Sequence, residues 1–223
     1  MKRAQYSVLV CVFLISYFDL TIAQDAQRRP EITIEIDGNS TNISIGGDGW
    51  GGVIANIRRL RQIPRDKDLS VVSALRSNMD ALPPAYIYEL VRRTCLTNPN
   101  EAAYLFNLAG ARMRYDAYRC VDETAKAGVQ ATLVSLQMPE CNASFNNELI
   151  LAALNQLRDA KEIFSSGASP WWICSHGLAA IAAGLSNKTL DAAEWLKPEG
   201  EWPRIREKVQ EDINSTLRMH SKR

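Results

Sequence analysis

Polar and apolar residues alternate near the start of the chain and then follow a helical spacing through most of its length. Ile32, Ile34 and Ile36, then Ile43 and Ile45, occupy every second position on either side of a turn-rich segment. This period of two is typical of a β-hairpin. Because an isolated hairpin is marginal in water, we expect it to pack on the rest of the chain, join a partner's sheet or stay partly disordered.

Beyond the hairpin, apolar residues recur every three or four positions, as they do on one face of an α-helix. The clearest example is the segment 101–119. A proline pair at 83–84 marks a helix start, and Asn98-Pro99 marks the end of that helix. The segments predicted to be helical are 53–63, 69–79, 85–97, 101–119, 125–137, 144–164, 171–185 and a C-terminal stretch behind Pro203 that includes Leu217. An extended conformation is the alternative for 69–72.

Two of these segments have distinctive patterns. The segment 171–185 is apolar on nearly every side and rich in Ala and Gly, which predicts a centrally buried helix. The C-terminal stretch has one apolar stripe on a charged helix and should close the bundle from outside. The expected fold is mainly α, a helical bundle (53–223) preceded by a β-hairpin and a Gly-rich linker (24–52).

The first 23 residues resemble a secretory signal peptide. A basic start is followed by an apolar run over 8–18 and by small residues at Thr21 and Ala23. We therefore expect cleavage after Ala23 and a soluble periplasmic or secreted protein. No membrane span is expected afterwards, because the most apolar stretch, 171–185, falls short of the roughly 20 residues that a span needs.

Positive and negative charges are nearly equal in number, which argues against some classes of partner. The chain has 26 Lys and Arg against 25 Asp and Glu, with 46% hydrophobic residues. A neutral, core-forming composition argues against nucleic-acid binding and against broad disorder. An ordinary globular protein is expected.

Four cysteines remain after removal of the signal peptide, and export favours disulfides over free thiols. Zinc is disfavoured because no C-x-x-C pair occurs. If consecutive helices alternate up and down, the segment 101–119 spans roughly 28 Å, so Cys95 and Cys120 lie at opposite ends. The segment 125–137 then returns toward Cys95 and places Cys141 near it, and 144–164 runs back and leaves Cys174 near Cys120. The predicted disulfides are Cys95–Cys141 and Cys120–Cys174.

Gly47, Gly49 and Gly52 match the G-x-G-x-x-G spacing of dinucleotide-binding loops. The strand–helix–strand context with a suitably placed acidic residue is missing. We interpret the segment as a linker and predict no cofactor.

No catalytic or metal-binding set is predicted. His220 lies in the basic C-terminal tail, and His176 lies in the apolar segment 171–185, where a hydrogen-bonded core histidine is the simplest interpretation. Catalysis by His176 would need a nucleophile and an orienting acid, and no such group stands out. Carboxylates that are distant in sequence but paired in space remain an open alternative.

The strongest polar pattern lies on one face of the segment 101–119, at spacings of three, four and seven residues: Arg112, Tyr115, Asp116 and Arg119. An ion-paired, solvated helix face is one interpretation. Arg and Tyr are also the residue types that anchor protein interfaces. We therefore predict Arg112, Tyr115 and Arg119 as partner-binding residues.

Several stretches resemble a group of uncharacterised bacterial exported proteins: LPPAYIYELVRR (82–93), EAAYLF (101–106), RYDAYRC (114–120), PWWICSHG (170–177) and EWP (201–203). The resemblance implies a helical bundle in the periplasm or outside the cell and no established activity. The region 101–110 is also similar to Sel1 and tetratricopeptide helix pairs, although no 34-residue period follows. Some exported proteins of this kind are immunity partners of secreted toxins, and the likeness to them is only an analogy.

These observations predict a non-enzymatic exported protein that acts through protein–protein interaction, as an envelope accessory or a toxin-immunity protein. The alternative is an exported hydrolase acting on envelope sugar or lipid through carboxylates and His176. An enzyme is the less favoured class, because no catalytic signature accompanies the fold.

Overall fold

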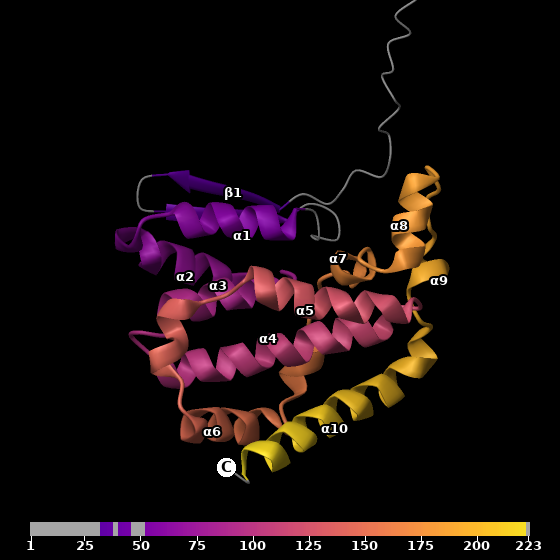
Figure 1. Ribbon diagram of the computed structural model, residues 1–223. Coiled ribbons are helices and arrows are strands. Elements are labelled where there is room, and N and C mark those ends of the chain that lie inside the picture. The colour runs from indigo at the N-terminus through magenta and orange to yellow at the C-terminus, as the bar shows by residue number, and fades with distance from the viewer. Residues whose placement is uncertain (1–31, 38–39, 46–51, 222–223) are drawn as a thin grey trace, which may run out of the picture.

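A computed structural model describes residues 32–37, 40–45 and 52–221 of the chain. The expected signal peptide (1–23) and most of the glycine segment (46–51) lie outside these residues. Within them the fold is mainly α with a two-stranded antiparallel sheet, which confirms the predicted class (Figure 1).

The hairpin packs on the helical body. Strands β1 (Ile32–Asp37) and β2 (Ser40–Ile45) pair in a register that sets Ile34 opposite Ile43. Ile34 is buried, and the hydroxyl oxygens of Thr41 and Ser70 lie 2.8 Å apart. Of the three expected situations for the hairpin, packing on the rest of the chain is therefore the correct one.

The central element is α4 (Pro99–Arg119), which lies between α3 (Ala85–Thr94) on one side and α6 (Asn147–Leu157) with α10 (Trp202–His220) on the other (Figure 1). The side chain of Asn98 accepts a hydrogen bond from the Glu101 backbone N–H and so begins α4, with Pro99 in its first turn. The other helices are α1 (Val53–Gln62), α2 (Asp68–Ser77), α5 (Lys126–Ser135), α7 (Trp171–Cys174), α8 (Leu178–Leu185) and α9 (Ala192–Trp195).

Short 3-10 segments lie in the connections between several of these helices. The predicted helix over 144–164 is therefore too long, because its last residues form one of these segments. Asn146 caps α6 through the Leu149 backbone N–H, and α6 ends at Leu157. The 3-10 segments are η1 (Arg65–Lys67), η2 (Glu123–Ala125), η3 (Pro139–Ser144), η4 (Lys161–Phe164) and η5 (Glu199–Glu201).

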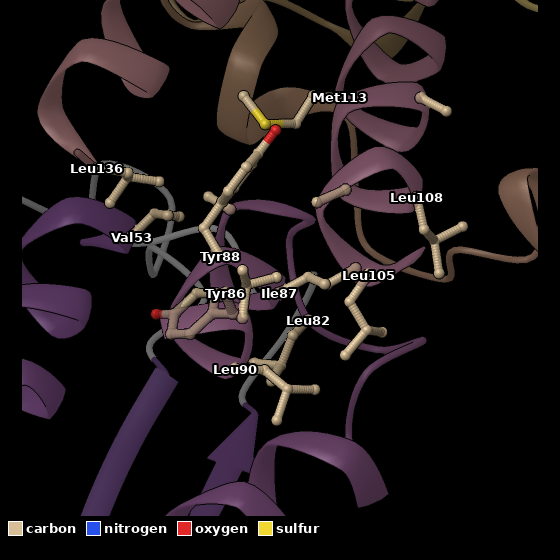
Figure 2. Packing of buried hydrophobic residues seen from close by; sticks show 14 of the residues in the cluster. Val53, Leu82, Tyr86, Ile87, Tyr88, Leu90, Leu105, Leu108, Met113 and Leu136 are labelled. Atoms are coloured by element: carbon tan, nitrogen blue, oxygen red, sulfur yellow. The ribbon is translucent and has the colours of Figure 1, made fainter. Parts of the chain in front are cut away.

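The core is centred on α3, which is buried along its whole length because α1 and α2 cover one side and α4 the other. Figure 2 shows Tyr86, Ile87 and Leu90 of α3 among side chains of the neighbouring segments. The hydroxyl end of Tyr88 points toward Met113 of α4. This continuous cluster fixes the helices that carry the features described below.

Both predicted disulfides are present within the described residues. Cys95 at the end of α3 joins Cys141 of η3, with Cα atoms 5.6 Å apart. Cys120 at the end of α4 joins Cys174 of α7, with Cα atoms 5.3 Å apart. The pairing confirms that the helix ends meet as the up-and-down arrangement requires.

None of the helices in the described part of the chain combines the length and apolar character needed to cross a membrane.

Candidate functional site

The three residues predicted to bind a partner lie in the interior. Arg112, Tyr115 and Arg119 are 1%, 2% and 5% exposed. The prediction of a partner surface is therefore corrected. The alternative expected ion pairs on a solvated face; Arg112 and Arg119 do form ion pairs, but their side chains are buried. The central helix α4 is covered by neighbours on most sides, so even its polar face is buried.

Arg112 of α4 forms hydrogen bonds with two connecting segments that are far from it in the sequence. Its guanidinium donates to the Asp80 carboxylate at 2.6 Å and to the Glu162 carbonyl at 2.8 and 3.0 Å. A further bond reaches the carbonyl of Met79 at 3.3 Å. These contacts hold the α2–α3 connection and η4 against α4, which is a structural role.

Arg119 and Asp116 form a second buried group. The Asp116 carboxylate, which is fully buried, accepts a 2.7 Å bond from the Trp172 indole N–H and pairs with Arg119. The Arg119 guanidinium lies over the rings of Tyr115 and Trp202, at 4.4 and 5.1 Å from their centroids. Burial raises the pKa of Asp116, although Arg119 opposes that shift. The group fastens α7 and α10 to α4.

The feature that stands out on the surface is α8. The sequence predicts that 171–185 is one buried helix, but the structure divides it at residues 175–177 into α7 and α8. Leu178, Ile181 and Leu185 are 66%, 48% and 83% exposed. Figure 1 shows α8 projecting from the body above α9. The prediction of central burial therefore holds for α7 and is wrong for α8.

A distant loop caps the N-terminus of α8. Gly177 at the cap position has no side chain to accept a bond, and the Asp122 carboxylate accepts one from the Ala179 N–H at 2.7 Å. The Thr124 hydroxyl accepts another from the Leu178 N–H at 2.9 Å. A Cβ at Gly177 would lie 2.6 Å from an Asp122 oxygen. The glycine is thus required for this cap.

Substituting Asp122 with alanine is expected to loosen α8 while leaving the bundle folded. Loss of a capping carboxylate typically costs about 1 kcal/mol, which should appear as faster amide exchange in α8. The exposed Asp66→Ala change is the control and should leave that exchange unaltered. Equal exchange in α8 of wild type and Asp122→Ala would contradict the assigned cap.

The cap should also respond to acid. Hydrogen bonds from the Thr124 side chain and then the Ala179 backbone lower the pKa of Asp122 below its usual 3.8. A carboxyl with a lowered folded-state pKa stabilises the folded form above its usual pKa and loses that contribution as pH falls through the lowered value. The protection of α8 amides, taken relative to their intrinsic exchange rate at each pH, should therefore fall below about pH 4 in the wild type and change less in Asp122→Ala.

His176 is exposed beside this cap, so the prediction of a core histidine is corrected. The chain turns at His176 between α7 and α8, and its Cβ lies 3.0 Å from a Cβ position built on Gly128. Among the described residues, no group of three or more His, Cys, Asp or Glu side chains is placed to hold a metal ion.

The chain matches no protein-family model, no curated protein and no solved structure.

Proposed function

We propose that this chain is a non-enzymatic exported protein that binds another protein through α8. The observation that carries the proposal is the exposure of Leu178, Ile181 and Leu185 on a helix that has no polar side chain. The two disulfides support an oxidising compartment. The proposed class, envelope accessory or toxin-immunity protein, follows the resemblance to exported bacterial proteins.

The partner is proposed to present an uncharged apolar groove. Leu178, Ile181 and Leu185 follow the i, i+3, i+7 spacing by which a helix anchors itself in a groove. No charge lies within α8, and beyond it Lys188 pairs with Glu194 at 2.6 Å. Recognition would therefore depend on apolar burial and little on salt.

A groove fits α8 better than a second copy of the same helix. Eight residues span about 12 Å, and a helix-to-helix contact would cover one side of each. A stable interface buries about 800 Å² on each partner. Ala179, Ala182 and Gly184 are exposed as well, so an enclosing groove covers far more of α8.

The proposal is tested by placing a photoreactive residue at Ala182 and irradiating the protein in the exported fraction of its own cells. The captured protein is then purified and titrated against the triple variant Leu178→Gln, Ile181→Gln and Leu185→Gln. We expect binding to weaken at least about 100-fold, because central apolar anchors each contribute roughly 1–3 kcal/mol. Thermal stability should change little, since the three side chains are exposed.

The matched control is Leu69→Gln, Leu96→Gln and Val134→Gln, three exposed apolar residues outside α8. It should bind as the wild type does. The proposal fails if the α8 triple variant binds equally well, or if α8 instead drives self-association in sedimentation. Flotation with phosphatidylglycerol–phosphatidylethanolamine vesicles that depends on α8 would also contradict it and indicate a lipid surface.

A further inference from the structure

An apolar cavity of about 350 Å³ lies on the bundle away from α8, where the end of α5 and η3 meet α3 and α4. Its walls are mainly aromatic and aliphatic side chains. The lining includes Tyr88, Phe106, Leu133, Leu136, Met138 and Phe145.

The aromatic walls support one another. The Phe106 ring stands at 86° to the Tyr88 ring with centroids 5.5 Å apart, and it lies 5.7 Å from the Phe145 ring. Edge-to-face contacts of this kind are favourable beyond the area that they bury. Tyr88 is itself buried, so its ring is fixed by the core.

The side of the cavity formed by the end of α5 and by η3 is held to two other helices, α1 and α3. The Leu136 carbonyl accepts a 3.1 Å bond from Arg61, and the Cys141–Cys95 disulfide holds η3 to the end of α3. These links oppose collapse of the cavity by movement of η3. The cavity therefore belongs to the folded framework.

The buried side chains that line the cavity are mainly apolar, and its two amide side chains are exposed. Leu136 is buried and Leu133, Met138 and Phe145 are half-buried, whereas Gln137 and Asn142 are exposed at the mouth. No charged side chain is among the described residues that line the cavity. An apolar interior with a few amide groups is typical of small-molecule sites.

We propose that this cavity binds a small uncharged molecule with an apolar body and one polar end. An apolar cavity of about 150 Å³ accommodates benzene, so about 350 Å³ accommodates two fused rings or a chain of about ten carbons. The body contacts the Tyr88, Phe106 and Phe145 rings, and the polar end meets Gln137 and Asn142. A carboxylate is disfavoured because no cation lines the cavity to compensate its desolvation.

The test uses 2-naphthol as the probe with the disulfide-bonded protein. Exclusion of water should shift its emission from the naphtholate band to the neutral naphthol band, with a dissociation constant of about 10–100 µM for a ligand of this size. Titration should move the ring-proton resonances of Phe106 and Phe145. Decan-1-ol should displace the probe at least about tenfold more effectively than decanoate.

Two neighbouring positions give a matched pair of variants. Leu133→Trp should fill the cavity and weaken 2-naphthol binding at least about tenfold, while Val134→Trp, on the exposed side of α5, should leave it within about twofold. The proposal is overturned if the probe does not bind, if the two variants bind alike, or if the Phe106 and Phe145 resonances stay unchanged on binding. Decanoate binding as tightly as decanol would overturn the uncharged class. The wild-type measurements decide the matter even if Leu133→Trp fails to fold.

Discussion

Glu89→Gln is expected to lower the free energy of unfolding by about 3–5 kcal/mol, the usual cost of removing one partner from a buried ion pair. The carboxylate of Glu89 is wholly buried in α3 and accepts hydrogen bonds from two arginines. Its oxygens lie 2.7 Å from Nε and Nη2 of Arg92 and 2.8 Å from Nε of Arg93. Arg61 approaches from α1 at 3.4 Å.

The same arginines connect this group to other elements. Arg93 pairs with Asp68 of α2, and Arg92 lies 3.2 Å from Glu140 of η3. The hydrogen bonds with Glu89 are the largest factor that raises the pKa of Arg92, so this guanidinium stays charged. A neutral glutamine would leave these buried cations with too little negative charge, which is why the expected loss is large.

The loss is measured by urea denaturation followed by circular dichroism. Asp159→Asn is the matched control, because it also changes a carboxylate to an amide but in an exposed pair with Arg158 at 3.5 Å. Exposed pairs contribute at most about 1 kcal/mol. A Glu89→Gln variant as stable as Asp159→Asn would show that the buried network does not stabilise the fold.

Removal of either disulfide is expected to lower the free energy of unfolding by about 4 kcal/mol. The linked cysteines are 46 and 54 residues apart, and loop-closure entropy for loops of this length gives roughly that value. The double variants Cys95→Ala with Cys141→Ala and Cys120→Ala with Cys174→Ala are compared with the wild type by guanidinium denaturation under oxidising conditions.

The two double variants should differ in local behaviour. Cys174 ends α7, directly before the connection to α8, so the loss of its bond should speed proteolysis between Ser175 and Leu185. Loss of Cys95–Cys141 should leave that segment as resistant as in the wild type, when each protein is digested at the same interval below its own unfolding midpoint. Unfolding energies within about 1 kcal/mol of the wild type would contradict the expected stabilisation, and equal proteolysis would contradict the local role of Cys174.

Much of the fold follows from local patterns in the sequence. The alternation of Ile34, Ile43 and their neighbours determined the hairpin, and helical spacing determined α4 and α10. The disulfide pairing followed as well, because short connections between consecutive helices force their ends to alternate. These features depend on residues near one another in the chain and on simple geometry.

The environment of polar residues was decided by tertiary packing. Arg112, Tyr115 and Arg119 share a helix face, and Glu89 precedes Arg92 and Arg93 by three and four residues. Such spacings are equally common on solvated helices, so they do not reveal burial. Only the covering of α3 and α4 on several sides turned these faces into interior networks.

The surface features were also decided by distant contacts. An apolar helix without a polar face gives the same sequence signal whether it is buried or projects into solvent, and the position of α8 depends on Asp122 and Thr124, more than fifty residues earlier in the chain. The cavity brings together Tyr88, Phe106 and Phe145 from three separate segments. The sequence by itself determined the hairpin and most of the helices, because these arise from local periodicity, and it determined the disulfide pairing, because consecutive helices alternate in direction. Tertiary structure alone decided which faces are buried and which are open, because burial depends on what packs against each element.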